Sequence, residues 1–249
     1  MSVGGTRVNS LKYKLMTIEF LNLAKDRYTY RELSQITGLP ETVLSRYVKG
    51  HVLPTFRRAE SINLAMHKVM RLDVELQIRI KFDEMGYFDN TGIISDPILL
   101  ERAVQHAINR FAGKRITKTL TAEVDGVPLA TLLAHRLGVD LIIAKKTREI
   151  GVREFIEEVY IPSKTAMMRS LYVSRGAMKK GDHILIVDDI IDSGETQKAL
   201  VQMAHRAKAE VTGIYALVGI GRDWKNRIEQ IANCPVEVVL EVAKKPWMG

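Results

Sequence analysis

The spacing of apolar residues divides the chain into two parts with different periods. In the first part, apolar residues recur every three or four positions, which predicts short amphipathic helices. The second part contains short apolar runs that alternate with helical stretches, which is typical of a sheet covered by helices. We therefore predict an α/β protein. An all-α domain of residues 1–63 is followed by a connecting helix of residues 64–87 and an α/β domain of residues 88–249.

Four short helices are predicted in the first part. Thr29 is a candidate N-cap, and Glu32 stands three residues later as its capping-box partner. Gly38 and Gly50 end the second and third helices. The predicted helices are Tyr13–Leu23, Tyr30–Thr37, Glu41–Lys49 and a fourth that opens at Pro54-Thr55.

Residues 64–87 carry two overlapping patterns. Apolar residues occupy every second position from Leu72 to Phe82, which argues for a strand. A helical stripe also runs from Val69 to Ile80 through the same segment. Because neither Gly nor Pro occurs between Ser61 and Met85, we predict one long connecting helix, which we expect to pack against a partner subunit.

The second part predicts a central, mainly parallel sheet. The run from Ile184 to Val187 is continuously apolar, as in a parallel strand covered on both faces. A helix is predicted over Ile98–Phe111, and residues 147–168 are charged and irregular. The predicted strands are Ile116–Leu120, Leu141–Ala144, Leu171–Val173, Ile184–Val187, Gly213–Gly219 and Val236–Val242.

Composition is ordinary for a globular protein and restricts the environment. The chain has 249 residues, of which 46% are hydrophobic, and no apolar run reaches the roughly 18 residues that span a bilayer. Residues 1–10 lack the apolar core of a signal peptide. Cys234 is the only cysteine, which excludes an internal disulfide or a multi-cysteine metal site. We expect a cytoplasmic protein with no membrane partner.

Positive charge is concentrated in the first third of the chain. The net charge is +8, and residues 1–83 hold 14 Lys and Arg against 8 Asp and Glu. Residues 84–249 are nearly neutral, with 23 against 21. A basic segment on a neutral body suggests a polyanion partner, although a solvated basic surface would look the same.

Two adjacent carboxylates follow the most apolar strand. Asp188 and Asp189 come directly after Val187, and a loop of small residues then leads into a helix. The carboxyl end of a parallel strand is where α/β sheets bind ligands, and the amino end of a helix favours an anion. Adjacent carboxylates suit a sugar diol or a hydrated Mg²⁺. The predicted sugar-phosphate site is Asp188, Asp189, Asp192, Ser193, Gly194, Glu195 and Thr196, with Asp188 and Asp189 as the candidate Mg²⁺ ligands.

An earlier strand is followed by a second glycine-containing loop. Gly126 permits close approach of the backbone, and the N–H groups before the next helix can form an anion-binding nest. Lys145 and Lys146 end the following strand and face the same crevice. By itself this loop favours an ordinary strand-to-helix turn, and the pairing with the two carboxylates about 60 residues later favours a binding loop. The residues involved are Glu123, Val124, Asp125, Gly126, Lys145 and Lys146.

Together these motifs resemble type I phosphoribosyltransferases. The string Val187-Asp-Asp-Ile-Ile-Asp-Ser-Gly-Glu-Thr196 is similar to their motif for phosphoribosyl pyrophosphate (PRPP). The resemblance implies that Asp188 and Asp189 hold the ribose hydroxyls, that residues 192–196 wrap the 5′-phosphate, and that the loop at 123–126 with Lys146 contacts pyrophosphate. It also implies Mg²⁺ bound with PRPP, and a loop at 147–168 that closes over the ligand. Asp192 and Glu195 depart from the usual loop, in which small residues are more common.

The second and third helices resemble a repressor-type helix-turn-helix. They are joined by a tight Gly38-Leu39-Pro40 turn inside the basic segment. The resemblance implies that Glu41–Lys49 is a recognition helix, with its first exposed residues on base edges and its basic end on phosphates. The predicted contacts to double-stranded DNA are Thr42, Ser45, Arg46, Lys49 and His51.

The order of the two domains resembles a family of transcriptional regulators. A helix-turn-helix followed by a phosphoribosyltransferase-like domain is similar to archaeal GfcR-type regulators and to the purine repressor of Gram-positive bacteria. The resemblance implies a homodimeric DNA-binding regulator that senses PRPP or a nucleotide. We assign no catalytic residue. The alternative is an active phosphoribosyltransferase that transfers ribose 5-phosphate from PRPP to a purine or pyrimidine base.

Overall fold

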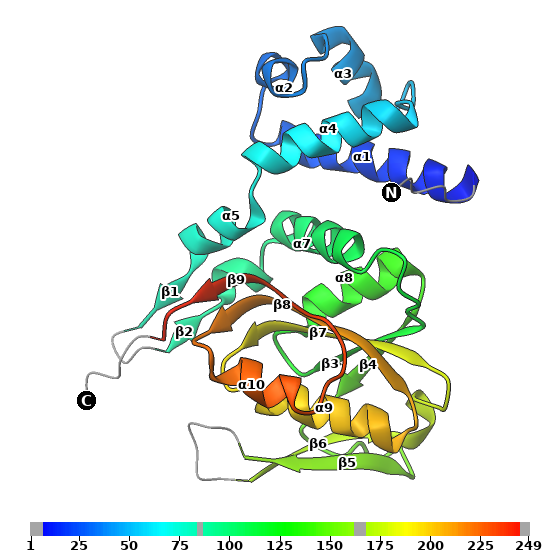
Figure 1. Ribbon diagram of the computed structural model, residues 1–249, viewed down its shortest axis with the longest axis vertical. Coiled ribbons are helices and arrows are strands. Elements are labelled where there is room, and N and C mark those ends of the chain that lie inside the picture. The colour runs from blue at the N-terminus through cyan, green and yellow to red at the C-terminus, as the bar shows by residue number, and fades with distance from the viewer. Residues whose placement is uncertain (1–6, 84–86, 162–167, 245–249) are drawn as a thin grey trace. The chain divides into compact units, whose positions relative to one another are not determined.

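The computed structural model describes residues 7–83, 87–161 and 168–244, and the chain forms two compact units (Figure 1). The first unit is Met1–Arg71 and the second is Leu72–Gly249. Each unit has its own hydrophobic core, so each is described separately.

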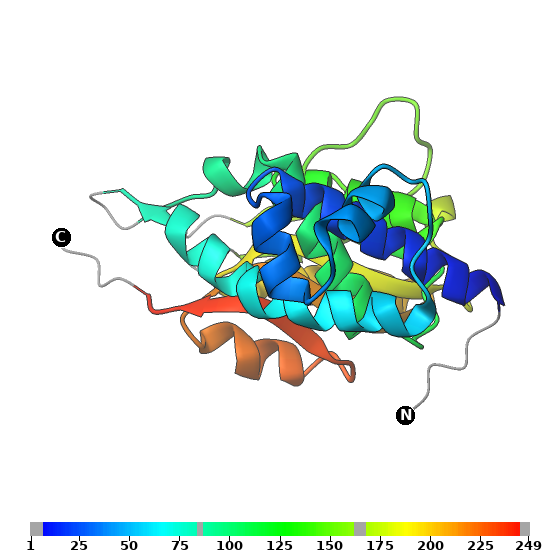
Figure 2. The same ribbon diagram turned by 90° about the horizontal axis from the view of Figure 1, so that it is seen from above.

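The first unit consists of four helices, as predicted. They pack around the buried side chains of Leu21, Leu33, Leu44 and Met66. Figure 2 shows the ribbons of these helices from above. The capping box is confirmed, since Thr29 accepts from the Glu32 backbone N–H and the Glu32 carboxylate accepts from that of Thr29. The helices are α1 (Arg7–Lys25), α2 (Tyr30–Thr37), α3 (Glu41–Val48) and α4 (Phe56–Val69).

The predicted long connecting helix over residues 64–87 is wrong. Helix α4 ends at Val69, because Met70 leaves the helical conformation with φ −104° and ψ 64°. A new helix, α5 (Leu72–Arg79), begins directly, and it buries Leu72 and Leu76 in the core of the second unit. Most of the predicted stripe therefore lies on α5, since Leu72, Leu76 and Ile80 pack in the core of the second unit, whereas Val69 at the end of α4 is exposed. Strands β1 (Lys81–Phe82) and β2 (Phe88–Asp89) then form a short antiparallel hairpin.

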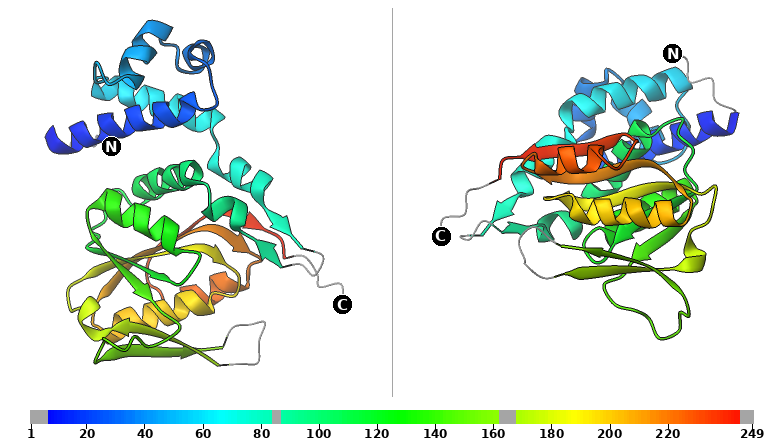
Figure 3. Two further views of the ribbon diagram at one scale, coloured as in Figure 1. Left: turned by 180° about the vertical axis from the view of Figure 1, so that it is seen from behind. Right: turned by 60° about the horizontal axis from the view of Figure 1, so that its bottom comes forward.

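The second unit is built on a parallel sheet with the order β4-β3-β7-β8-β9 (Figure 3). Strand β7 is central and buried along most of its length, as its apolar run predicted. The fold class of an α/β domain with a central parallel sheet is confirmed. The strands are β3 (Lys118–Ala122), β4 (Asp140–Ala144), β7 (His183–Ile191), β8 (Glu210–Ile220) and β9 (Val236–Val242).

Helices cover both faces of this sheet, and alternate residues of β7 point to opposite sides. Leu185 and Val187 face α7 (Pro97–Arg110) and α8 (Val127–Leu137). Ile184 and Ile186 face α9 (Glu195–Arg206) and α10 (Asp223–Glu229). A short helix, α6 (Thr91–Ile94), precedes α7, and a 3-10 turn, η1 (Arg175–Ala177), precedes β7.

Part of the segment predicted to be irregular is a strand. Within residues 147–168, β5 (Phe155–Tyr160) pairs antiparallel with β6 (Arg169–Ser174) and packs against α9. Its Glu158 is buried, and Arg206 on α9 neutralises it with an N–O distance of 2.9 Å. A charged residue therefore occupies the inward face of the strand. For this reason the sequence does not show the alternation of apolar and polar residues that predicts a strand. Residues 162–167 of the predicted closing loop lie outside the described residues.

Within the described ranges, none of the helices combines the length and the apolar character that a bilayer crossing demands.

Candidate functional site

The predicted ligand-binding residues meet at one edge of the sheet. Strands β3, β4 and β7 are parallel, so their carboxyl ends lie together. After β3 the chain crosses to β4, and after β7 it crosses in the opposite direction to β8. The neighbouring strands β3 and β7 thus form a topological switch point, where α/β folds open a crevice for ligands.

The paired acids at the end of β7 are buried and held in place by amide donors. Asp188 is 7% exposed and Asp189 is 6% exposed. The Gln197 side-chain amide donates to Asp188 Oδ2 at 2.6 Å, and the Asp189 backbone N–H donates to Asp188 Oδ1 at 3.0 Å. The Asn90 side-chain amide donates to Asp189 Oδ2 at 2.6 Å. The two carboxylates are therefore oriented before any ligand arrives.

Burial makes both acids harder to ionise. It raises the pKa of Asp188 well above its ordinary value of 3.8, and the neighbouring Asp189 charge raises it further. Burial also raises the pKa of Asp189, while the hydrogen bond from Asn90 lowers it. Two adjacent buried acids lower the stability of a fold. Carboxylates in a crevice whose pKa values are shifted are therefore typical of functional sites.

The loop after β3 packs directly against this acid pair. A Cβ atom added to Gly126 would lie 2.7 Å from Asp188 Oδ1 and 2.5 Å from Thr121 Oγ1. No side chain larger than hydrogen fits there. Gly126 then begins α8, so the backbone turns from strand to helix within van der Waals reach of the acids. Gly126 was predicted to let the backbone come close to a ligand. In the structure, the residue that this backbone approaches closely is Asp188.

The remaining residues of this loop lie beside the lysine pair. The peptide bond between Glu123 and Val124 is cis. The Glu123 carboxylate accepts from the Lys146 backbone N–H at 2.5 Å, so the loop is tied to the end of β4. Lys145 forms an ion pair with Glu149, whereas Lys146 and Asp125 are exposed at the crevice edge.

The loop after β7 is a tight turn from the strand into α9. Gly194 adopts φ 78° and begins α9, and the Glu195 backbone N–H donates to Ser193 Oγ at 3.4 Å. A Cβ on Gly194 would lie 3.2 Å from the Trp224 Cβ. Trp224 is buried against this loop and packs in the core.

Both unusual carboxylates of this loop are neutralised by cations from later in the chain. Lys244 lies 3.5 Å from Asp192, and Arg227 Nε lies 3.0 Å from Glu195. Arg227 also donates to the Ser193 carbonyl. The negative charges are therefore compensated, which removes the electrostatic objection to binding a phosphate here.

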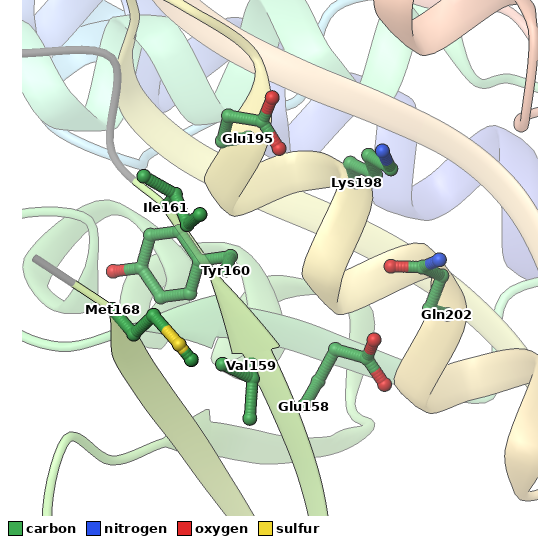
Figure 4. A pocket seen from close by; sticks show the side chains of 8 residues that line it. All are labelled: Glu158, Val159, Tyr160, Ile161, Met168, Glu195, Lys198 and Gln202. Carbon is green, nitrogen blue, oxygen red and sulfur yellow. The ribbon is translucent and has the colours of Figure 1, made fainter. Parts of the chain in front are cut away.

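A pocket of about 380 Å³ lies beside the start of α9, between that helix and the β5–β6 hairpin (Figure 4). Glu195, Lys198 and Gln202 line it from the helix, and Tyr160 and Met168 line it from the hairpin. The hairpin thus lies next to the phosphate-type loop.

The described residues contain no preformed metal cage. None of their His, Cys, Asp and Glu side chains form a cluster of three or more that could hold an ion. Asp188 and Asp189 are two carboxylates only, and Mg²⁺ sites built on one or two carboxylates are completed by substrate phosphates and water. The donor set therefore fits a cation that arrives with a diphosphate.

Three residues of the site were missed from the sequence: Asn90, Gln197 and Arg227. Gln197 directly follows Thr196 on the first turn of α9, which was a usable signal. Asn90 and Arg227 are far away in the sequence and carry no local signal.

The residues predicted to contact DNA lie on α3 and the following turn. Thr42, Arg46, Lys49 and His51 are exposed and Ser45 is half-buried. They share an accessible basic surface, which by itself defines no partner.

Comparison with known proteins identifies the family of the second unit. The Phosphoribosyl transferase domain matches residues 98–247. A hypoxanthine/guanine phosphoribosyltransferase from Methanosarcina acetivorans is 31% identical over 171 residues, which are 67% of this chain and 87% of that protein. A xanthine phosphoribosyltransferase from Agathobacter rectalis is 32% identical over 154 residues, or 58% of this chain and 79% of that protein.

Solved structures agree on the fold. An adenine phosphoribosyltransferase from Rhodothermus marinus superposes with a TM-score of 0.61 and 25% identity, over 69% of this chain and 98% of that one. The adenine phosphoribosyl transferase from Trypanosoma brucei was solved with AMP, pyrophosphate and ribose-5-phosphate. It gives a TM-score of 0.63 at 18% identity, over 68% of this chain and 79% of that one.

These findings overturn the expected function. The prediction of a DNA-binding transcriptional regulator is wrong, because the relatives that match this chain are purine phosphoribosyltransferases. The regulator hypothesis depended on the basic first third and its helix pair, and an exposed basic surface occurs on many proteins that bind no nucleic acid. The alternative, a phosphoribosyltransferase, is the better supported. With its family match, its parallel sheet and its acid pair at the switch point, the chain belongs to the family of phosphoribosyl transferase domains.

Proposed function

We propose that this protein is an active phosphoribosyltransferase that joins a purine base to the ribose 5-phosphate of PRPP and releases pyrophosphate. The observation that carries the proposal is the contact of Gly126 with Asp188, which brings two glycine loops and a buried acid pair into one crevice. The relatives named for hypoxanthine, guanine and xanthine support a purine as the acceptor.

Each loop would hold a different part of PRPP. Asp188 and Asp189 accept hydrogen bonds from the two ribose hydroxyls. Backbone N–H groups and hydroxyls of residues 192–196 bind the 5′-phosphate at the start of α9, where the helix dipole favours an anion. The loop of Glu123, Val124, Asp125 and Gly126, with Lys145 and Lys146, binds the pyrophosphate group.

The reaction exchanges one bond at the anomeric carbon of the ribose. The bond to the pyrophosphate oxygen breaks and a bond to a ring nitrogen of the base forms, while the proton of that nitrogen passes to water or to the departing pyrophosphate. Lys146 and the backbone N–H groups near Gly126 stabilise the negative charge that grows on the leaving group. The β5–β6 hairpin shields the crevice from water.

Divalent cation is expected to enter with the substrate. Asp188 and Asp189 would be the protein's ligands to Mg²⁺, and the diphosphate oxygens would complete its shell. When bound, Mg²⁺ supplies positive charge to the leaving pyrophosphate.

A base panel tests the proposal. The purified chain is incubated with PRPP and Mg²⁺ and with hypoxanthine, guanine, xanthine, adenine, orotate or uracil, and pyrophosphate release is measured. Turnover with at least one purine and none with the pyrimidines is expected. No turnover with any base would reject an active enzyme.

We also propose a helix-turn-helix architecture for the first unit, supported by the left-handed Gly38 between α2 and α3. In this proposal it is an accessory helical unit on an enzyme. Homodimerisation stays a prediction.

A further inference from the structure

A residue outside the matched family domain reaches the acid pair. Asn90 lies before the matched residues 98–247, yet its side-chain amide donates to Asp189 Oδ2 at 2.6 Å. Its backbone carbonyl at the same time accepts from the N–H groups of Ile93 and Ile94, at 2.8 and 3.0 Å. Asn90 therefore begins α6 with its backbone and holds Asp189 with its side chain.

The segment that carries Asn90 is fixed firmly to the second unit. On α5, Glu75 forms a buried ion pair with Arg102 of α7, and it also pairs with Arg79 at 3.0 Å. Arg79 in turn lies 2.8 Å from Asp96, which caps α7 through the N–H groups of Ile98 and Leu99. This network joins both ends of the segment to the same helix.

Apolar contacts complete the attachment. Leu72, Leu76 and Ile93 are buried in the core that α7 and α8 share with the sheet. The Phe82 and Phe88 rings of the hairpin meet edge to face with their centroids 5.4 Å apart, and both pack against that core. Asn90 is thus presented to Asp189 from a rigid support.

We infer that residues 72–83 and 87–96 are a working part of the PRPP site and that Asn90 is a positioning residue for Asp189. The hydrogen bond occupies Oδ2 of Asp189 and fixes the rotation of the carboxylate, so that its remaining lone pairs are directed at the ribose hydroxyls. The inference rests on the proposed function, since it assigns Asn90 to PRPP binding.

A double-mutant cycle tests whether Asn90 acts through Asp189. The PRPP dissociation constant is measured by calorimetry for the full-length wild type, Asn90→Leu, Asp189→Asn and the double variant. Losing a hydrogen bond to a charged acceptor should weaken PRPP binding by about ten- to hundredfold in Asn90→Leu. In the Asp189→Asn background the same change should add nothing.

Two further variants separate positioning from folding. Asn90→Ser keeps a residue that suits the first position of a helix but is too short to reach Asp189, so it should lose PRPP affinity as Asn90→Leu does. Asn109→Leu, on the exposed face of α7, is the matched control and should bind PRPP normally. The KM for the base should be unchanged in all Asn90 variants.

The outcomes distinguish the inference from the proposed function. If the wild type binds no PRPP, both are overturned. If the wild type binds PRPP and both Asn90 variants bind it equally well, only the inference is overturned. The inference would also be overturned if Asn90→Leu weakened PRPP binding by the same factor in the wild type and in Asp189→Asn. Asn90 would then act on PRPP binding without Asp189.

Discussion

The two glycine loops at the sheet edge are built differently, although both join a parallel strand to a helix. In the loop after β3, Gly126 has an ordinary φ and is required because Asp188 and Thr121 leave no room for a Cβ. In the loop after β7, Gly194 has φ 78° and also touches Trp224. The first loop therefore depends on contact with the acids, and the second depends on backbone conformation and on cations from elsewhere. Equivalent sequence patterns can thus have separate physical causes.

The largest effect is expected from Gly126→Ala. The added methyl group would overlap Asp188 and Thr121, so the loop must move, and overpacking of this kind costs about 1–3 kcal/mol of unfolding free energy. Turnover of PRPP should fall by at least about a hundredfold, since small displacements of reacting groups cost this much. Chemical denaturation and pyrophosphate release measure the two effects. Gly176→Ala, where a Cβ meets nothing within 4 Å, is the control. Equal stability and equal turnover of the two variants would show that Gly126 does not pack tightly against Asp188.

Gly194→Ala should have a smaller effect on stability, of about 1–2 kcal/mol, because alanine disfavours the left-handed conformation and its Cβ would crowd Trp224. Gly138→Ala separates these two causes, since Gly138 has φ 67° and nothing within 4 Å of its Cβ position. The excess loss in Gly194→Ala over Gly138→Ala measures the packing against Trp224. A loss no larger than that of Gly138→Ala would show that conformation alone requires the glycine.

Asp188→Asn should stabilise the protein while abolishing PRPP binding. Because the folded-state pKa of Asp188 lies above its ordinary value of 3.8, the folded state holds this proton more tightly than the unfolded state. Its contribution to stability is therefore fully present below about pH 3.8 and is lost as pH rises through the folded pKa. In metal-free buffer, the variant's gain in melting temperature should be near zero at low pH and reach a few degrees at pH 8. A gain that does not depend on pH would contradict this account.

The smallest effect is expected from Arg227→Met. The change removes the partner of Glu195 and a donor to the Ser193 carbonyl, and a partly exposed pair of this kind contributes about 1 kcal/mol or less. PRPP affinity should fall by roughly three- to fivefold, corresponding to such an energy. Lys225→Met on the same helix pairs with Glu241 away from the loop and is the control. Unchanged affinity in Arg227→Met would mean that the loop tolerates its own negative charge.

The sequence supported the sheet and the acid pair because both have local signals. The apolar run of β7 leads directly into Asp188, and strand, loop and helix follow in order. It could not place Asn90 against Asp189, because this contact joins residues 99 apart. Nor could it show that Glu158 faces inward, since its partner Arg206 lies on another element. The break at Met70 was hidden because apolar residues continue at helical spacing from α4 into α5, although Met66 lies in the first core and Leu72 and Leu76 lie in the second.

The position of β7 in the sheet also has a consequence for the order of folding. Its neighbour β8 follows after a single helix, whereas its other neighbour β3 lies about 60 residues earlier in the chain. Closing the shorter loop costs less entropy, so we expect β7, α9 and β8 to assemble before β3 joins them. The loop around Gly194 would then be formed before Gly126 reaches Asp188, so the newly folded chain would complete its two glycine loops one after the other.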